Sequence, residues 1–338
     1  MKQRCSIPYC EFETESDSDI ALKFHMSQCH PNYTDGKLGI FYPEPDPLFV
    51  VPEKVAAELK AIHALSQIHP VNVLVTGFPG GGKTTLGIQL AALAKRPCVV
   101  VDCGTLSEAS EWFSTTTLEE TEKGIITRTT ESAFVRGVET PGTIAILDEA
   151  NRAENEKVLN VLMPWLDERK MAWVEPLKRN VKVAVGVIFF ATLNEGAFFA
   201  GTNVVDRAVR DRFREIYLPY PPATVEAEIL MHKTKIGTEE AHLLADFAAR
   251  VRNNPKIDQK ISTRQLLTAA ENMLATNPPD HMLLGFWEAV GMAIGNYNNP
   301  MWREAVLADL HYLLDKKQLA DAKGPGTKDG YTNLQEYF

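Results

Sequence analysis

The sequence predicts an α/β fold in which a parallel sheet is flanked by helices, with an α-helical lid domain after it and a small Cys/His unit before it. Three observations support this prediction: a glycine-rich loop that follows an apolar run, five apolar runs that alternate with helical patterns, and apolar helical spacing beyond residue 222. Strands separated by helices favour a parallel sheet that is covered on both faces. At 338 residues the chain is long enough for two or more domains.

We divide the chain into five segments by its Pro and Gly residues, which interrupt regular structure, and by the periodicity of its apolar residues. They are a Cys/His unit at residues 1–30, a linker at 31–47, an α/β domain at 48–221, a helical lid at 222–318 and a flexible tail at 319–338. The linker prediction rests on Pro31, Gly36, Pro43, Pro45 and Pro47, which interrupt regular structure.

Apolar runs and periodic stretches give the expected elements. The strands are expected at residues 71–75, 98–102, 143–148, 183–192 and 215–218. The lid helices are expected to include residues 241–251, 266–274 and 287–294, where apolar residues recur at helical spacing.

The charge and the termini exclude several classes of protein. The net charge of −9 argues against a surface built as a whole to bind DNA. No apolar run approaches the roughly 20 residues of a membrane span, and the N-terminus lacks the pattern of a secretory signal. We therefore expect a protein that does not enter a membrane. A nucleotide site and a Cys/His metal cluster both suit a reducing cytoplasm, which is the location we expect. Cys98 and Cys103 flank a predicted strand and are expected to be buried packing thiols.

The glycine-rich loop has the pattern of a phosphate-binding loop. Its sequence, Gly77-Phe78-Pro79-Gly80-Gly81-Gly82-Lys83-Thr84, fits G-x-x-x-x-G-K-[ST] and lies between a predicted strand and a predicted helix from about residue 84 to 94. Its backbone N–H groups and the helix N-terminus would surround a triphosphate. Lys83 would reach the β- and γ-phosphates, and the Thr84 hydroxyl would hold Mg²⁺. Thr85 completes the predicted ATP-binding set.

Two later strands end in polar residues that complete a nucleotide site. Asp148 and Glu149 follow an apolar strand, and Asn194 follows the next one. Asp148 would bind Mg²⁺, directly or through water, and Glu149 would polarise the attacking water. The Asn194 amide would hold that water or contact the γ-phosphate. Each motif is weak alone, but their order after Lys83 makes the combination specific.

These motifs resemble the AAA+ ATPases, and among them the MoxR-type branch that includes the cobaltochelatase ATPase subunit and the CbbQ/NorQ activators. The resemblance covers about residues 48–300 and rests on residues 77–85, 144–152, 191–194, 206–213 and 262–264. It implies that Asn194 is sensor 1 and that Arg264 is sensor 2 on the lid. It also implies that Arg212 is the arginine finger that reaches a neighbouring subunit's nucleotide, with Arg207 and Arg210 as alternatives.

The resemblance also implies a ring and two inserted hairpins. An arginine that acts in trans needs a neighbouring subunit, and a head-to-tail interface closes into a ring or grows as a helix. The family implies a homohexamer. Residues 124–130 and 171–185 resemble hairpin insertions that point toward the central pore in related rings, although two exposed hairpins without substrate contact are the alternative.

The N-terminal unit has the ligand spacing of a zinc finger. Cys5-x₄-Cys10-x₁₄-His25-x₄-His30 lies close to the C₂H₂ pattern, with Cys29 as an alternative fourth ligand to His30. Thirty residues bury too little surface to fold alone, so Zn²⁺ would supply the stability.

This finger is expected to bind protein rather than DNA. The residues at its base-reading positions are Ser18, Ala21 and Phe24, and the last two offer no hydrogen bond to a base edge. Residues 1–30 carry three basic and five acidic side chains, a net charge of −2 that would repel phosphate.

Three functional hypotheses follow. The leading one is an ATP-hydrolysing ring motor that remodels or activates a protein client, with the finger as a docking module. The family implies that a separate von Willebrand factor A domain protein takes part. The alternatives are a DNA-directed motor, with Lys178 and Arg179 on a strand in the pore, and a slowly hydrolysing, nucleotide-gated binding module.

Overall fold

The computed structural model describes residues 3–4, 13–14, 39–121, 124–154, 156–194, 206–255, 260–276, 308 and 330–337. Within the first segment, β1 (Gln3–Arg4) pairs antiparallel with β2 (Glu13–Thr14). The four predicted zinc ligands and the predicted helix at residues 287–294 lie outside the described residues.

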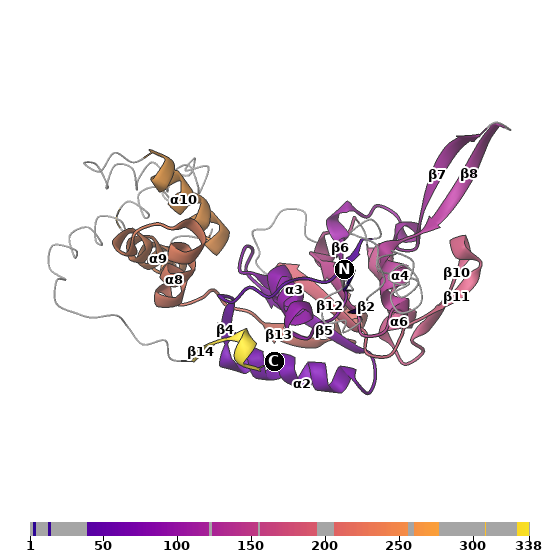
Figure 1. Cartoon of the computed structure of the whole chain (residues 1–338), viewed down its shortest axis with the longest axis horizontal. Helices are drawn as coiled ribbons and strands as arrows, with labels where there is room; N and C mark the ends of the chain where they lie inside the picture. Colours follow the sequence, from indigo (N-terminus) through magenta and orange to yellow (C-terminus); the bar gives the residue numbers. More distant parts are fainter. Residues whose placement is uncertain are drawn as a thin grey trace.

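The centre of the molecule is a six-stranded sheet. Its order is β13 (Arg214–Tyr217), β5 (Val71–Gly77), β12 (Ile188–Asn194), β9 (Ile144–Asp148), β6 (Cys98–Asp102) and β3 (Ile40–Phe41). The first five strands are parallel, and β3 joins the edge antiparallel to β6. All five predicted strands are therefore present, and the α/β fold class is confirmed (Figure 1).

Both faces of this sheet are buried under helices. Along β12, Phe189 and Ala191 join the core beneath α4 (Ala133–Glu139), α5 (Glu156–Asn160) and α6 (Met163–Leu166). Ile188 and Phe190 alternate with them and join the opposite core, beneath α2 (Glu53–Ser66) and α3 (Lys83–Leu93). Because every second residue of a strand points to the same face, continuous apolar runs are what a sheet covered on both faces requires.

Short helical turns connect these elements. They are η1 (Cys103–Thr105), η2 (Ala109–Trp112), η3 (Ala150–Arg152), η4 (Glu175–Leu177) and α7 (Arg207–Arg210). Cys98 and Cys103 are both buried, as expected, and burial raises the pKa of the Cys98 thiol to about 12. Such a thiol stays protonated at neutral pH and acts as a small apolar side chain.

The helical lid packs around a core of its own. It contains α8 (Ala223–Thr234), α9 (Thr238–Asn253) and α10 (Thr263–Thr276), which include two of the predicted helices. Leu230, Phe247 and Leu266 are among its buried residues. Figure 1 places this lid at one end of the molecule and two hairpins at the other.

The two hairpins are at the places where the sequence predicts insertions. β7 (Ser114–Thr121) pairs with β8 (Gly124–Glu131) and projects from the body, and β10 (Met171–Val174) pairs with β11 (Arg179–Lys182) beside it (Figure 1). Exposed apolar side chains lie on both hairpins: Ile125, Ile126, Met171 and Trp173.

The C-terminal residues correct the prediction of a flexible tail. β14 (Tyr331–Asn333) pairs antiparallel with β4 (Val50–Pro52), and η5 (Leu334–Tyr337) follows it. Leu334 is only 1% exposed and joins the core under α2. The end of the chain thus returns to the α/β domain. The predicted linker also differs, because β3 places Ile40 in the core at the sheet edge.

No helix among the described residues is long and apolar enough to cross a bilayer.

Candidate functional site

The predicted site residues meet at the carboxyl edge of the sheet. β12 lies between β5 and β9 and runs parallel to both, so their ends lie next to one another. In this register Asn194 is level with Gly77 at the start of the glycine-rich loop. Asp148 is the last residue of β9, on the other side of β12, and Glu149 follows it. The sheet therefore brings motifs that lie far apart in sequence to one place.

The glycine-rich loop adopts a conformation that glycine favours. Gly80 and Gly82 have φ angles of 65° and 87°, in the left-handed region that side chains with a Cβ rarely adopt. Gly82 is the N-cap of α3, so the helix begins at Lys83. Lys83 is 6% exposed, and its Nζ donates to the carbonyl oxygens of Gly77 (3.1 Å) and Phe78 (2.7 Å). The lysine ammonium is thus held inside the curve of the loop.

Three oxygen-bearing side chains converge beside the loop. The Thr84 hydroxyl donates to Oδ1 of Asp148 at 2.5 Å, and the Thr192 hydroxyl donates to the same oxygen at 2.7 Å. Thr84 lies in the first turn of the helix after the loop, whereas Thr192 is in β12 and is 1% exposed. Hard oxygen donors of this kind are the ligands that Mg²⁺ prefers.

Glu149 is held by two neighbours in an uncommon backbone conformation. Its φ and ψ are both 49°, a left-handed conformation for a residue that is not glycine. Its carboxylate accepts a hydrogen bond from Nδ2 of Asn194 at 2.8 Å and pairs with Arg152, also at 2.8 Å. Its backbone N–H donates to the Thr192 hydroxyl at 2.9 Å. The predicted water-polarising acid and the predicted sensor amide are therefore in direct contact.

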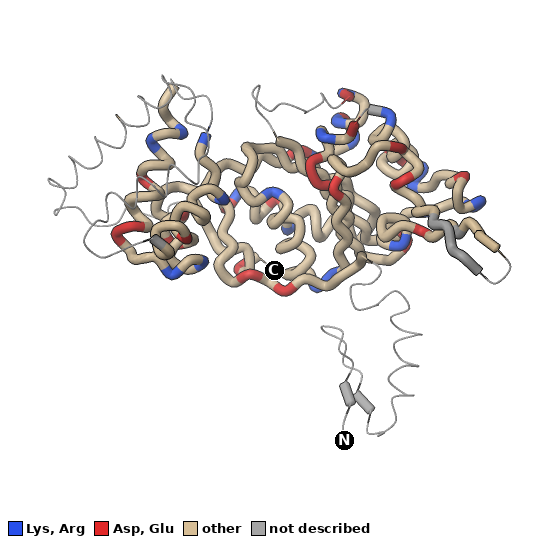
Figure 2. Tube along the Cα trace, turned by 90° about the horizontal axis from the view of Figure 1, so that it is seen from above, with Lys and Arg blue, Asp and Glu red and all other residues tan. Residues whose placement is uncertain are grey.

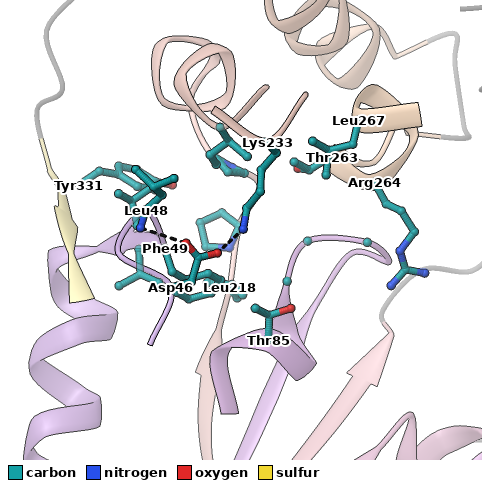
Figure 3. Close-up of a pocket in the computed structure, with 18 of the residues that line it drawn as sticks. Asp46, Leu48, Phe49, Thr85, Leu218, Lys233, Thr263, Arg264, Leu267 and Tyr331 are labelled. Atoms are coloured by element: carbon teal, nitrogen blue, oxygen red, sulfur yellow. Dashed lines mark hydrogen bonds and ion pairs between the residues drawn. The ribbon is translucent and has the colours of Figure 1, made fainter. Parts of the chain in front are cut away.

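The lid meets the loop at the N-terminus of α10. A Cβ added to Gly80 would lie 2.6 Å from the Ser262 Cβ and 3.5 Å from the Arg264 Cβ. Figure 3 shows the Arg264 side chain beside the loop. The structure thus places the predicted sensor 2 arginine at the loop, although it comes from a different domain.

The three candidate finger arginines lie around α7 and differ in exposure. Arg212 is half-buried, and its guanidinium donates to the Ala208 carbonyl oxygen. Arg210 pairs with Glu215 at 2.5 Å. The Arg207 side chain is 93% exposed, with Asp211 at 3.9 Å. All three remain candidates, because their proposed target belongs to another subunit.

A largely apolar pocket opens beside the loop, between the α/β domain and the lid (Figure 3). Phe49 and Leu218 belong to its α/β wall, Leu267 comes from α10, and Tyr331 comes from the C-terminal strand. Thr85 also lines it.

One ion pair, between Asp46 and Lys233, crosses this pocket from the segment before β4 to the lid helix α8 (Figure 3). Burial raises the pKa of the Asp46 carboxyl, but the hydrogen bonds from Lys233 and from the Leu48 N–H, together with the nearby positive charge, outweigh burial and leave that pKa below its ordinary value. Asp46 therefore carries its negative charge at neutral pH and holds the lysine ammonium at the rim of the pocket.

Several residues at the site have contacts that the sequence motifs did not predict. Thr192 connects Asp148 to Glu149, and Asn151 donates from Nδ2 to the Asn194 carbonyl oxygen at 3.0 Å. Both lie inside the matched motifs, so their positions, though not their partners, were visible in the sequence. Tyr331 lies in the segment predicted to be a flexible tail and carried no signal at all.

The basic residues that a DNA-directed motor would use are already paired. Arg179 donates to Glu131 at 2.7 Å and to Glu139 at 2.6 Å, and Lys178 pairs with Glu175. These hydrogen bonds raise the pKa of Arg179 above its ordinary value. In Figure 2 acidic and basic residues are interleaved along the described chain. The described residues contain no group of three or more His, Cys, Asp or Glu placed to hold a metal ion.

Comparisons with known families divide the chain as the fold does. Residues 72–213 match the AAA domain (dynein-related subfamily), and residues 226–295 match the CbbQ/NirQ/NorQ C-terminal domain.

Comparisons with individual proteins extend this likeness. The chain is 34% identical over 279 residues to the putative chaperone BssE of Thauera aromatica, a match that covers 82% of this chain and 93% of that protein. It is 24% identical over 232 residues to midasin of Giardia intestinalis, a match that covers 65% of this chain but only 5% of midasin. Among solved structures, the RuvB Holliday junction branch migration motor of Thermotoga maritima has a TM-score of 0.46 at 17% identity, covering 73% of this chain and 72% of that one.

Proposed function

Because this chain belongs to the MoxR-type AAA+ ATPases, with an AAA domain followed by a CbbQ/NirQ/NorQ C-terminal domain, we propose that it hydrolyses ATP to remodel or activate a protein client. The observation that carries the proposal is the convergence of Lys83, Asp148 and Glu149 at one edge of the sheet. Its likeness to a putative chaperone over most of both chains supports a protein as the client.

The proposed roles follow from the positions of the side chains. The loop from Gly77 to Gly82, with Pro79 and Gly81 within it, surrounds the phosphates, and Lys83 neutralises part of their charge. Glu149 orients and polarises the attacking water, while Asn194 fixes the Glu149 carboxylate by its 2.8 Å hydrogen bond. Arg264 approaches the phosphates from the lid. The apolar pocket lined by Phe49 and Leu267 accepts the base.

Magnesium fits the donor set that the structure presents. The Thr84 hydroxyl and Asp148 Oδ1 lie 2.5 Å apart, and both are oxygen ligands suited to Mg²⁺. Bound there, Mg²⁺ would neutralise developing charge on the phosphate oxygens. Asp148 is held in place by Thr192, so its carboxylate is oriented before a metal arrives.

We further propose a ring in which a finger arginine of one subunit serves the nucleotide of the next. A homohexamer is the assembly that the family implies. The two hairpins (Figure 1) would face the client, since both carry exposed apolar side chains. These are Ile125 on one hairpin and Trp173 on the other. A separate von Willebrand factor A domain protein is the proposed partner, and the cytoplasm is the proposed location.

The N-terminal unit is proposed to bind Zn²⁺ and to dock onto protein. Two thiols and two imidazoles, from Cys5, Cys10, His25 and His30, are the nitrogen and sulfur donors that zinc prefers. Zinc content of the full chain, compared with that of Cys5→Ser, tests this. One zinc per chain that is lost in the variant is expected, and an unchanged zinc content would overturn the proposal.

The test of the function is capture of the client by Glu149→Gln, which should retain ATP. Lys83→Ala, which should not bind ATP, is the matched control. We expect Glu149→Gln to recover a protein that Lys83→Ala does not recover. Once purified, that protein should raise the ATPase rate of the wild type. Recovery of nuclease-sensitive DNA without such a protein would instead favour the DNA-directed motor. The paired states of Lys178 and Arg179 argue against that outcome.

A further inference from the structure

Tyr220 lies where the chain passes from the α/β domain to the lid. It is in the segment between β13 and α8, next to Pro219, Pro221 and Pro222, whose rings fix φ and stiffen the crossing. Its hydroxyl donates to the Pro79 carbonyl oxygen of the glycine-rich loop at 2.8 Å. Its ring also stacks on Phe78, with centroids 5.6 Å apart and an interplanar angle of 7°. Tyr220 therefore makes two separate contacts with the loop.

The same ring contacts the lid through a cation. The guanidinium carbon of Arg252, in α9, lies 4.0 Å from the centroid of the Tyr220 ring, within the range of a cation–π contact. Arg252 in turn makes two hydrogen bonds to the Glu226 carboxylate, at 2.7 and 2.8 Å. Glu226 is completely buried in α8, and the side chain of Arg252 is 10% exposed. Breaking such a buried pair leaves an uncompensated charge, so the pair holds Arg252 in one orientation.

The contacts then return to the loop by a second route. The Thr263 hydroxyl donates to Glu226 at 2.6 Å, and Thr263 is the first residue of α10. Ser262, just before it, packs against Gly80, where an added Cβ would come within 2.6 Å. Pro79 and Gly80 are adjacent in the loop. Pro79 is thus joined to Arg252 through Tyr220. Its neighbour Gly80 is joined to Glu226 through Ser262 and Thr263, at the start of α10.

We infer that Tyr220 is a positioning residue that holds the glycine-rich loop in its phosphate-binding shape and couples that shape to the lid through Arg252 and Glu226. This inference rests on the proposed ATPase function. Beyond Phe78, whose carbonyl accepts from Lys83, the loop residues that present N–H groups to phosphate must turn their carbonyl groups outward. The Tyr220 hydroxyl holds the Pro79 carbonyl in that direction. Burial raises the pKa of Tyr220 to about 12, so its hydroxyl stays protonated and remains a donor at neutral pH.

Tyr220→Phe is the variant that tests the hydroxyl, because it keeps the ring contacts with Phe78 and Arg252. A single neutral hydrogen bond is worth enough to weaken ATP binding about three- to tenfold. We expect that loss in titrations of the full-length protein with fluorescent ATP and Mg²⁺. Tyr337→Phe, which removes a hydroxyl from η5, is the matched control and should bind ATP like the wild type.

Thr263→Val tests the coupling, because it removes the other hydroxyl that contacts the network. The double variant combines Tyr220→Phe with Thr263→Val. If Tyr220 acts through Arg252 and Glu226, the loss of ATP affinity in the double variant should differ at least about threefold from the product of the two single losses. Multiplicative effects would show that Tyr220 acts on the loop alone and would overturn the coupling. Melting curves without nucleotide should differ by no more than the few degrees that one hydrogen bond is worth, whereas a purely structural role would lower stability without weakening ATP binding.

The outcomes separate this inference from the proposed function. If the wild type binds no ATP, the proposed function fails and the inference fails with it. If the wild type binds and hydrolyses ATP while Tyr220→Phe matches it in affinity and rate, only the inference is overturned. Weaker ATP binding by Tyr220→Phe together with non-multiplicative effects in the double variant supports both.

Discussion

At the scale of single residues, the site is organised by hydrogen bonds between side chains that come from different strands. Thr192 contacts both Asp148 and the backbone of Glu149, and Asn194 contacts the Glu149 carboxylate. A carboxylate that is held from two sides loses little conformational freedom when substrate arrives. The left-handed backbone of Glu149 is a local strain of the kind that clusters at functional sites. Two substitutions at this site, one of Lys83 and one of Glu149, have sharply different expected results.

Lys83→Ala should abolish ATP binding. The Lys83 ammonium is buried inside the loop and is the only cation in the loop sequence, so alanine leaves the phosphate charge without that partner. Calorimetric titration with ATP and Mg²⁺ measures this. Lys54→Ala, at a position on α2 where the side chain is 87% exposed, is the control and should bind as the wild type does. Binding by Lys83→Ala at wild-type affinity would remove the lysine from the site.

Glu149→Gln should separate binding from hydrolysis. The amide keeps the size of the side chain and a hydrogen-bonding oxygen but cannot take up a proton, so ATP should still bind. Turnover should fall by about 10²- to 10⁴-fold, the usual contribution of a positioned acid or base. Phosphate release measured under saturating ATP tests this, with Glu58→Gln on α2 as the control. Unchanged turnover would exclude Glu149 from the reaction.

At the scale of elements, the C-terminal strand is a structural element that also lines the pocket. β14 pairs with β4, Leu334 is buried under α2, and Tyr331 lines the pocket. The Asn333 amide donates to the Pro47 carbonyl oxygen at 2.5 Å, which fixes the segment that carries Leu48 and Phe49. The C-terminal residues therefore hold in place the pocket wall that Leu48 and Phe49 form.

Two substitutions in this segment should separate its roles. Leu334→Ala should lower the free energy of unfolding by about 2–5 kcal/mol, because it leaves a cavity in the core. Tyr331→Ala keeps the strand pairing and should weaken ATP binding with a smaller effect on stability. Thermal melting and ATP titration of both variants measure this. If Tyr331→Ala bound ATP like the wild type, the tail would have a structural role only.

Arg179 connects the two hairpins and should show the salt dependence of a surface ion pair. It bridges Glu131 at the end of β8 and Glu139 at the end of α4, and all three side chains are about one-third exposed. Each pair is worth roughly 0–1 kcal/mol. Arg179→Met should therefore lower the melting temperature modestly at low salt, and the difference should shrink near 1 M salt, where the Debye length is about 3 Å. Lys182→Met, at an exposed position on the same strand, is the control. A difference independent of salt would indicate packing rather than charge.

The sequence predicted the elements that have strong local signals and missed those that depend on tertiary pairing. The continuous apolar run at the start of β5 and the alternating pattern around β10 and β11 each indicate a strand from neighbouring residues alone. β3 and β14 have two and three residues, too few for a periodic pattern, and their pairing depends on partners far away in sequence. The motifs likewise predicted Asp148 and Asn194 but not the contacts that Thr192 and Tyr220 make with the site.

At the scale of the whole molecule, the position of the lid relative to the α/β domain decides whether the site is complete. Arg264 reaches the loop only because α10 packs against Gly80, and the pocket has walls from both domains. Asp46 and Lys233 form an ion pair between the segment before β4 and the lid helix α8. Nucleotide binding between two such domains would change their relative position. In the proposed ring, that change would pass from one subunit to the next.

Mixing two inactive variants tests whether the finger arginine acts across a subunit interface. Arg212→Ala keeps Glu149 but lacks the arginine, whereas Glu149→Gln keeps the arginine but lacks the acid. If the arginine of one subunit serves the nucleotide of the next, a mixed ring contains interfaces in which both groups are intact. The mixture should then hydrolyse ATP faster than either variant alone, because an arginine finger is worth about 10³–10⁵ in rate in other phosphoryl-transfer systems.

The same experiment decides among the three arginines. Repeating the mixture with Arg207→Ala and with Arg210→Ala shows which variant is inactive alone and is rescued by Glu149→Gln. The exposed Arg207 can reach a neighbour as it stands, whereas Arg212 must first release the Ala208 carbonyl oxygen. Native mass spectrometry confirms that mixed rings have formed. If such rings were present and stayed as inactive as their parents for all three arginines, each subunit would complete its own site and the ring would serve only to hold the client.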